Sequence, residues 1–225
     1  MRIIDLSHPI DTGHPRYSIE RSVKGDLASG DLFQATTIRL GCHGFTHVDA
    51  RRHFFPDGRT IEETELDALV GEAVVVDLMD VAANEAIGPG KLADRGGAVT
   101  AGARVILKTG WHRHRDFYDI SFWRDAPYLT RDAAEWLRDR AIRTIAYDFP
   151  QDYCIRQLLD GIVAPVEQHV THDVLLRAGV HMIEYLTNTA EISAARVFLS
   201  AAPLKIVGAD GAPARVYAIE GSHPI

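Results

Sequence analysis

Cysteine is almost missing from this 225-residue chain, which contains only Cys42 and Cys154. Folds that depend on disulfide bonds use several pairs and zinc ribbons use CxxC pairs, so both classes are excluded and we expect two reduced thiols. No hydrophobic run is long enough to span a membrane. The most apolar stretch, residues 72–83, is interrupted by Asp77 and Asp80 and falls short of the about 20 residues that a spanning helix needs.

An excess of positive charge is missing as well. The chain has 24 basic and 31 acidic residues and a net charge of −7, which opposes binding to nucleic acids and to anionic membranes. Near the N-terminus the apolar pair Ile3 and Ile4 is followed directly by Asp5. This segment has neither the apolar core nor the cleavage site of a signal peptide. We therefore expect a cytoplasmic protein that binds a small molecule, with no nucleic-acid or membrane partner.

The remaining composition is that of an ordinary globular protein, with 46% hydrophobic and 24% charged residues. No repeat, low-complexity segment or linker divides the chain. A chain of this length can bury about 70% of its unfolded surface in one core. We predict a single domain, residues 1–225.

Alternating and β-branched patterns predict more strand than helix. Strands are expected at 35–44, 72–79, 103–110, 142–149, 180–187 and 196–209, and helices at 130–141 and 171–179. Strands and helices do not alternate as they do in a doubly wound parallel sheet. The expected fold class is α/β, with a mixed, largely antiparallel sheet or barrel and flanking helices.

The segment HGFTHVDARRHFF, residues 43–55, holds three of the chain's eleven histidines. His43 and His47 have the spacing of the HxxxH pair that binds zinc on a helix in metalloproteases. Gly44 stands where those enzymes have a catalytic glutamate, and the glycine, β-branched and aromatic residues around it disfavour a helix. An extended segment is the better interpretation.

In an extended segment, His47 and Asp49 point to the same face with Cα atoms about 6.6 Å apart, so both could bind one ion. His43 has the same parity but would lie about 13 Å from His47 in a regular strand. A bend is required if His43 is to take part, and Gly41 and Gly44 are the residues that permit one. The spacing alone leaves a metal site and a polar, histidine-rich loop as alternatives.

A second group of candidate ligands lies at residues 169–184. His172 begins the predicted second helix, and Glu184 falls among apolar residues of the strand that follows. A carboxylate buried there must be paired, protonated or bound to a metal, and a salt bridge is the structural alternative. For His169 and His181 we expect solvent-exposed side chains.

Taken together, these residues resemble the cyclase family of metal-dependent hydrolases, which includes bacterial kynurenine formamidases and isatin hydrolases. The family signature runs roughly His-x-Gly-Thr-His-x-Asp-x-Pro-x-His-Phe, and residues 43–54 read HGFTHVDARRHF. Further similarity lies in DLSHPI near the N-terminus, LKTGW at 107–111, AYDFPQD at 146–152 and the run from His172 to Asn188. The matches extend over nearly the whole chain.

The resemblance implies a metal site and a fold. By similarity, the metal ligands are His43, His47, Asp49, His172 and Glu184, with Asp49 able to bridge two ions, and His53 is the general acid/base. The cofactor would be Zn²⁺, two ions per chain, with Mn²⁺ as the alternative because imidazole and carboxylate ligands suit both. The resemblance also implies a swivelling β/β/α-like cyclase fold and a homo-oligomer, a dimer or tetramer.

Two departures from the family pattern concern substrate binding. Phe45 replaces the usual glycine and Arg51 the usual proline. Where kynurenine formamidases have a segment resembling TPxWPGD, this chain has GHPRYSIER, and Tyr17 takes the place of the tryptophan. Tyr17, Phe45 and Arg51 are therefore the candidate substrate-binding residues, and N-formylkynurenine is not the expected substrate.

The chemistry expected of such a site is hydrolysis of an amide C–N bond in a small aromatic or cyclic substrate, an arylformamidase-like reaction. A metal ion would activate water, and His53, with an ordinary pKa near 6.5, could transfer the proton to the leaving nitrogen. One alternative is a cyclic imide or lactone hydrolase of the isatin hydrolase type. A non-catalytic metal-binding protein is another, although it has no need of His53.

Overall fold

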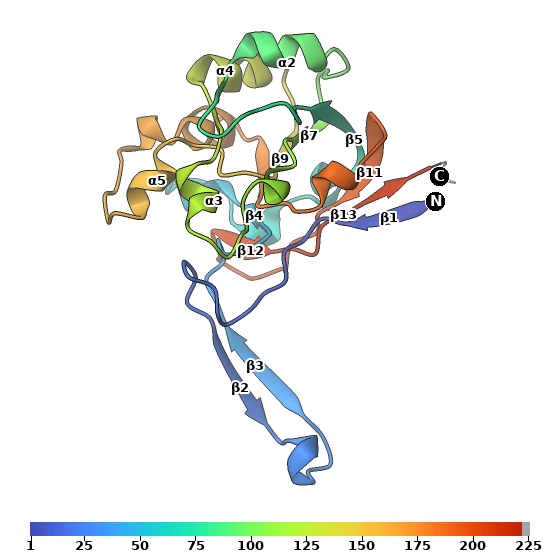
Figure 1. Ribbon diagram of the computed structural model, residues 1–225, viewed down its shortest axis with the longest axis vertical. Helices are drawn as coiled ribbons and strands as arrows, with labels where there is room; N and C mark the ends of the chain where they lie inside the picture. The colour runs from blue at the N-terminus through green and yellow to red at the C-terminus, as the bar shows by residue number, and fades with distance from the viewer. Residues whose placement is uncertain (222–225) are drawn as a thin grey trace.

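A nine-stranded sheet that curls into half a barrel forms the centre of the molecule (Figure 1). The computed structural model describes residues 1–221. The strand order is β1-β13-β11-β5-β7-β9-β10-β4-β12. These strands are β1 (Arg2–Asp5), β4 (His47–Asp49), β5 (Val70–Asp77), β7 (Arg104–Lys108), β9 (Thr144–Tyr147), β10 (His181–Glu184), β11 (Arg196–Ser200), β12 (Gly211–Pro213) and β13 (Tyr217–Glu220).

Five of the eight neighbouring strand pairs are antiparallel, and the three parallel pairs join β5, β7, β9 and β10 in the middle. The mixed, largely antiparallel sheet expected from the sequence is therefore confirmed. The parallel strands are buried on both faces, which explains why residues 73–76 and 144–147 read as unbroken apolar or β-branched runs.

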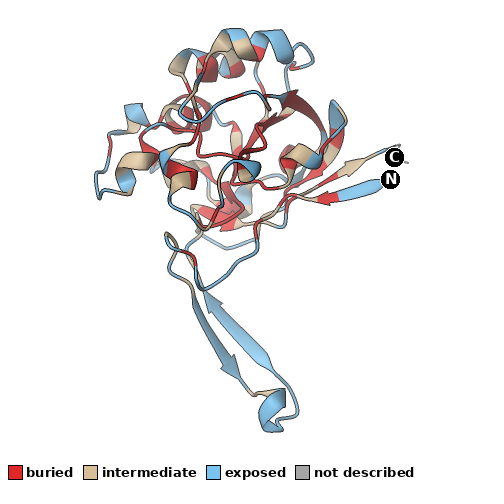
Figure 2. Ribbon diagram, viewed as in Figure 1, coloured by how far each residue is buried: buried red, intermediate tan, exposed pale blue. Residues whose placement is uncertain are grey.

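Alternate residues of the central strands enter two separate hydrophobic clusters. Val74, Val105 and Met182 point to one face of the sheet, and Val75, Ile106 and Ile183 point to the other. The first face is covered by helices, including α2 and α4, and the second by the strands that curl around it (Figure 1). Figure 2 shows the buried residues gathered along these strands.

The helices are short. They are α1 (Leu66–Leu69), α2 (Pro89–Arg95), α3 (Ser121–Arg124), α4 (Arg131–Asp139) and α5 (Ile155–Leu158), the 3₁₀ turns η1 (Leu27–Ser29), η2 (Arg51–His53), η3 (Ile61–Glu63), η4 (Trp111–Arg113), η5 (Val166–Gln168) and η7 (Thr189–Glu191), and the π-helical turn η6 (His172–Leu176). In the part of the chain that the structure describes, no helix has both the length and the apolar character needed to cross a membrane.

Helix α4 forms where the sequence predicts it, because Thr130 caps its first turn and Ala133, Ala134 and Leu137 are buried on one side. The strand predicted over residues 196–209 is shorter than expected. It ends at Ser200, and Pro203, which cannot continue a regular ladder, forms only an isolated bridge with Ala214.

One element projects from the body of the molecule. Strands β2 (Glu20–Lys24) and β3 (Ala35–Arg39) pair in an antiparallel hairpin with η1 at its tip (Figure 1). Every residue of both strands is exposed (Figure 2). The remaining strands, β6 (Ala86–Ile87) and β8 (Tyr128–Leu129), form a small separate ladder.

Candidate metal centre

Strand β4 holds the first two candidate ligands rigidly, because it pairs with β10 on one side and β12 on the other. His47 and Asp49 point to the helix-bearing face, since Val48 between them enters the opposite cluster. His47 Nε2 lies 3.2 Å from Asp49 Oδ1 and 3.8 Å from Glu184 Oε2. All three side chains are almost fully buried.

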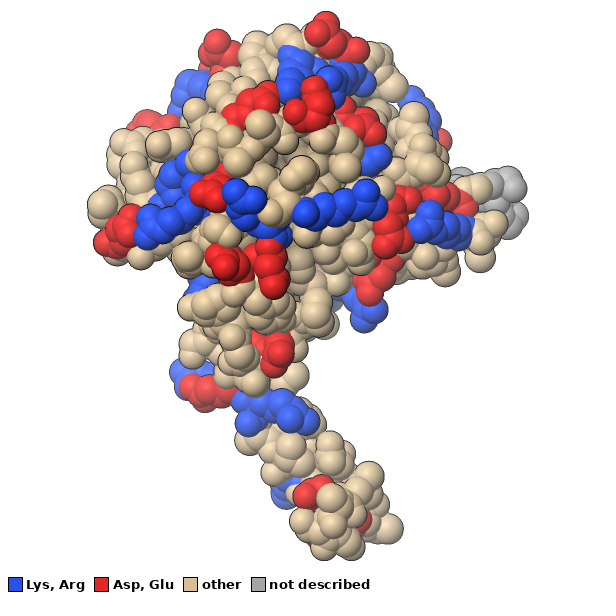
Figure 3. Space-filling view, in the orientation of Figure 1, with Lys and Arg blue, Asp and Glu red and all other residues tan. Residues whose placement is uncertain are grey.

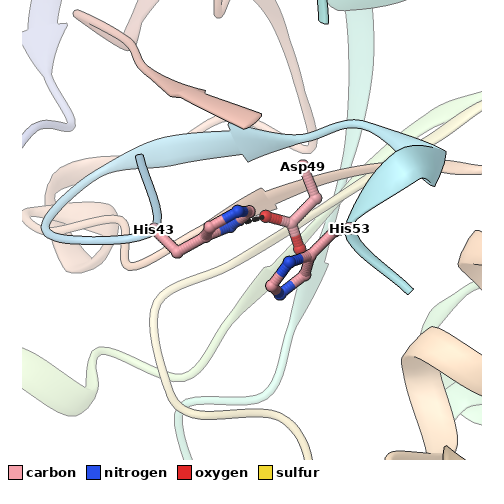
Figure 4. A group of neighbouring side chains, drawn as sticks. All are labelled: His43, Asp49 and His53. Carbon is pink, nitrogen blue, oxygen red and sulfur yellow. Dashed lines mark hydrogen bonds and ion pairs between the residues drawn. The ribbon is translucent and has the colours of Figure 1, made fainter. Parts of the chain in front are cut away.

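His43 reaches the same carboxylate from the loop before β4. Its Nδ1 lies 2.8 Å from Asp49 Oδ1 (Figure 4). The bend required by the sequence is present, but neither Gly41 nor Gly44 has a positive φ; Phe45 does, at 60°. The family's usual glycine at this position is thereby explained, because the left-handed conformation is unfavourable for other residues.

His53 lies at the end of η2, next to His43, and its ring also faces Asp49 (Figure 4). Its ring stacks on that of His43, with centroids 3.6 Å apart. Asp210 contacts both rings, with Oδ2 3.0 Å from His43 Nε2 and 3.5 Å from His53 Nδ1. The following Gly211 leaves room for His43, because a Cβ there would lie 2.6 Å from His43 Cε1.

The second group of candidate ligands meets the first at Asp49. His172 Nε2 lies 3.4 Å from Asp49 Oδ2 and 3.5 Å from Glu184 Oε1. Gln151 donates a hydrogen bond to Glu184 Oε1. His172 Nδ1 lies 2.7 Å from Asp152 Oδ2. The structure therefore brings together all five sequence-predicted ligands and His53.

His169 differs from the sequence expectation. It is buried rather than exposed, with its ring 5.0 Å from that of Phe54 and 5.8 Å from that of His172. His181 is half-buried at the start of β10. The expectation failed because a lone histidine carries no local sign of the aromatic residue that will cover it.

The pKa values of the buried carboxylates and of His172 are strongly shifted. Burial would raise the pKa of Asp49, but its contacts with the imidazoles of His172, His43 and His47 hold it well below its usual range. Burial and the nearby Asp49 raise the pKa of Glu184. Burial opposes a charge on His172, yet Asp152 and Asp49 hold the pKa of His172 well above its ordinary value. Two buried carboxylates this close require positive charge between them.

A divalent cation fits these residues. His43 Nε2, His47 Nε2 and Asp49 Oδ2 are buried, and within residues 1–221 their contacts with Asp210, Asp49 and His172 lack hydrogen-bond geometry. One ligand atom from each of His47, Asp49 and Glu184, and likewise from His43, Asp49 and His53, lies within 4.8 Å of the others in its group. Imidazole nitrogens and carboxylate oxygens are ligands of zinc and of manganese.

Two of the three candidate substrate-binding residues lie beside this cluster. The Tyr17 ring is 5.4 Å from that of Phe45 and 6.5 Å from that of Tyr185, which in turn is 5.6 Å from His47. Arg51 lies elsewhere, with its guanidinium over the Phe55 ring at 5.4 Å. It lines a separate cavity of about 310 Å³ that none of the candidate ligands reaches. A role for Arg51 in substrate binding stays a prediction.

Sequence reasoning missed three polar residues at the centre. Asp152 and Gln151 lie in the segment AYDFPQD, whose only signal in the sequence is its resemblance to the family. Asp210 is a lone aspartate in a turn between Gly208 and Gly211. Its only local signal is the adjacent glycine, because the contact with His43 depends on how β12 pairs with β4.

Comparison with known proteins identifies the family of the chain. A family model described as "Putative cyclase" matches residues 4–151. Kynurenine formamidase from Bacillus mycoides is 27% identical over 219 residues, and that from Geobacillus thermodenitrificans is 29% identical over 218 residues; each alignment covers 94% of both chains.

Solved structures give the same result. A "potential metal-dependent hydrolase with cyclase activity" has a TM-score of 0.74 and 31% identity and covers 96% of both chains. Isatin hydrolase A from Labrenzia aggregata has a TM-score of 0.80 at 24% identity, over 96% of this chain and 93% of the other, and shows the shared fold. The chain therefore belongs to the cyclase family.

Proposed function

We propose that this protein is a metal-dependent hydrolase that cleaves the amide C–N bond of a small aromatic or cyclic substrate. The observation that carries the proposal is Asp49, whose carboxylate is approached by His43 and His47 on one side and by His172 on the other. The kynurenine formamidase relatives support an acyl C–N bond as the target. The two free thiols agree with action in the cytoplasm.

Two Zn²⁺ ions per chain suit the donor set, and Mn²⁺ is the alternative. His43, His47, Asp49, His172 and Glu184 would together hold the ions. Such an ion supplies Lewis acidity, polarising the carbonyl under attack and lowering the pKa of water toward about 7. The short contact from Gln151 orients Glu184, and Asp152 orients His172.

His53 is the proposed general acid/base. Burial lowers its pKa to about 4, so that the ring is unprotonated at neutral pH and able to accept a proton. Stacking on His43 and the contact with Asp210 fix the orientation of the ring. From this position His53 would take a proton from the attacking water and pass it to the leaving nitrogen.

The substrate class follows from an aromatic wall beside the metal ligands, formed by Tyr17, Phe45 and Tyr185. These rings lie next to His47 and suit a flat substrate ring. Hydrolysis of a cyclic imide or lactone is the alternative, supported by the similarity of the fold to isatin hydrolases.

Two measurements test the proposal. Elemental analysis of protein purified without chelator is expected to find zinc, two ions per chain, and a panel of aryl formamides, cyclic imides and lactones is expected to show turnover of the formamides. A metal-loaded protein that turns over only imides or lactones would establish the alternative. Absence of turnover on the whole panel would favour a metal-binding protein without catalysis.

We also propose that the chain forms a homo-oligomer through the β2–β3 hairpin. An isolated two-stranded hairpin is only marginally stable in water, and this one exposes Val23, Leu27, Leu32, Phe33 and Ile38. Acidic and basic side chains are interspersed on the face of the molecule seen in Figure 3, without a large area of one sign. A second copy covering the hairpin would shield its apolar side chains from water.

A further inference from the structure

Three hydrogen-bond donors near the metal centre are buried without a well-aligned hydrogen bond. They are Arg16 Nη1, the Tyr17 hydroxyl and Trp123 Nε1, none of which makes a well-aligned hydrogen bond within residues 1–221, although Tyr17 and Trp123 both contact the Tyr185 hydroxyl. Arg16 also forms no ion pair in the same part of the chain. Leaving such a group unsatisfied costs about 1 to 3 kcal/mol, and more when it is charged, so the Arg16 guanidinium in particular indicates a binding function.

These donors belong to one cluster. The Arg16 guanidinium carbon lies 5.3 Å from the centre of the Trp123 ring and 5.7 Å from that of Tyr17. The Tyr17 and Trp123 rings are 6.1 Å apart, and the Tyr185 ring is within 6.5 Å of both. Tyr17 and Trp123 contact the Tyr185 hydroxyl, and the positive charge of Arg16 acts on the same group.

The cluster adjoins the catalytic centre. Tyr185 directly follows Glu184, and its ring lies 5.6 Å from that of His47. The Thr46 hydroxyl donates a 2.6 Å hydrogen bond to the Tyr185 carbonyl and ties this wall to the strand that carries the ligands. A substrate whose amide lies at the metal centre would therefore extend its ring along Tyr185 toward Arg16.

The chemistry of the three groups selects the ligand. An arginine nitrogen and an indole nitrogen donate hydrogen bonds and cannot accept them, and the tyrosine hydroxyl can donate. A planar anion with two acceptor oxygens satisfies such a set, and a guanidinium binds carboxylates with its parallel N–H groups. A flat aromatic acid would place its ring against Tyr17 and Trp123 and its charge at Arg16.

We propose that Arg16, Tyr17 and Trp123 form a subsite for a carboxylate carried on the ring of the substrate. The proposal rests on the proposed function, since it adds a negative charge to the aromatic amide that the metal centre would cleave. Arg16 is the residue that selects for this charge, and Tyr17 and Trp123 complete the hydrogen bonds.

Binding of benzoate tests the subsite without any need for turnover. Calorimetry on the metal-loaded protein is expected to show that Arg16→Met weakens benzoate binding about 10- to 100-fold, the effect of losing a hydrogen bond to a charged group. Arg16→Lys is expected to recover part of the loss. The uncharged analogue benzamide should bind the wild type and Arg16→Met equally, and Arg113→Met, which removes an exposed arginine, should leave benzoate binding unchanged.

Other outcomes would overturn the subsite. If benzoate and benzamide are weakened equally by Arg16→Met, the arginine only packs on the aromatic rings. If a chelator abolishes benzoate binding while Arg16→Met does not alter it, the carboxylate binds the metal. Circular dichroism of each variant establishes that it is folded, and Trp123→Phe, which keeps a ring and removes the N–H, gives a second measurement if Arg16→Met does not fold.

Kinetics then connect the subsite to the reaction. Formanilide and its ring-carboxylated analogues are compared, and Arg16→Met is expected to raise KM about 10- to 100-fold for the best carboxylated substrate while leaving KM for formanilide unchanged. Equal effects on both substrates would contradict the subsite. If no amide is hydrolysed but benzoate binding still depends on Arg16, the proposed function fails and the carboxylate site stands.

Discussion

His172 Nδ1 lies 2.7 Å from Asp152 Oδ2, while the opposite nitrogen of the same ring faces Asp49 and Glu184. Asp152 is itself fixed, because its other oxygen accepts a 2.7 Å hydrogen bond from the Thr171 backbone nitrogen. The carboxylate therefore sets which nitrogen of His172 is free to bind a metal.

We expect Asp152→Asn to weaken metal binding about 10- to 100-fold, because the amide cannot orient the imidazole as the carboxylate does. Competition with a zinc-binding dye measures the affinity. Asp173→Asn, which alters a half-buried carboxylate that pairs with Arg131 outside the centre, is the matched control. Equal affinities for wild type and Asp152→Asn would show that Asp152 does not orient the ligand.

His53→Ala is expected to lower turnover about 10²- to 10⁴-fold, the usual contribution of a general acid/base, while the metal content stays unchanged. Steady-state kinetics and elemental analysis are measured on the same preparation. His114→Ala, which removes an exposed histidine, serves as the control. Loss of metal from a folded His53→Ala protein would instead make His53 a ligand.

Phe45 combines a fully buried ring with a φ of 60°. Removing the ring is expected to cost about 3 to 5 kcal/mol, but glycine tolerates this φ and alanine does not, by about 1 to 2 kcal/mol. Chemical denaturation should therefore find Phe45→Gly more stable than Phe45→Ala. The reverse order would mean that the left-handed conformation at this position carries no strain.

His8 predicts how stability depends on pH. Burial, with repulsion from His112 and His14, lowers its pKa to about 3. Between pH 6.5 and pH 3 the unfolded chain binds a proton at this residue and the folded chain does not, so stability is complete above pH 6.5 and falls as the pH decreases. From pH 7 to pH 5, urea denaturation should show wild type losing about 2 kcal/mol more than His8→Gln. Equal losses would indicate that His8 titrates normally in the folded protein.

The exposed apolar residues of the hairpin predict an effect on assembly. Replacing Leu32 and Phe33 by aspartate is expected to convert the oligomer to monomers, because both side chains are exposed near the tip of the hairpin. Light scattering coupled to gel filtration gives the mass. The control replaces Leu204 and Val207 by aspartate, since both are also exposed but lie on the body of the molecule. An unchanged mass in the hairpin variant would show that the hairpin is not part of the interface.

Local patterns were sufficient for the parts of the site that lie on strands. The parity of His47 and Asp49 follows from the period of an extended chain, and the burial of Glu184 follows from its apolar neighbours. The order of strands in the sheet could not be predicted from local patterns, because the pairing of β4 with β10 joins residues more than a hundred positions apart. The contacts of His172 with Asp49 depend on that pairing.

The other features that the sequence did not predict also depend on tertiary packing. Asp210 and His169 show nothing unusual in their own segments, and each gains its role from a residue brought near by tertiary packing, His43 for the first and Phe54 for the second. The bend before β4 was expected from glycines, yet Phe45 adopts the left-handed conformation because its ring is fully buried there. Packing outweighed the local preference at this position.

The projecting hairpin also joins two parts of the site along the chain. Tyr17 precedes β2 by three residues and His43 follows β3 by four, so the strands of the hairpin lead out from the aromatic wall and back to the first candidate ligand. If a second copy holds the hairpin in place, the wall and the ligand are ordered by the same event. Activity per chain would then rise with protein concentration and fall on dilution, a behaviour that a centre carried entirely by the nine-stranded sheet would not show.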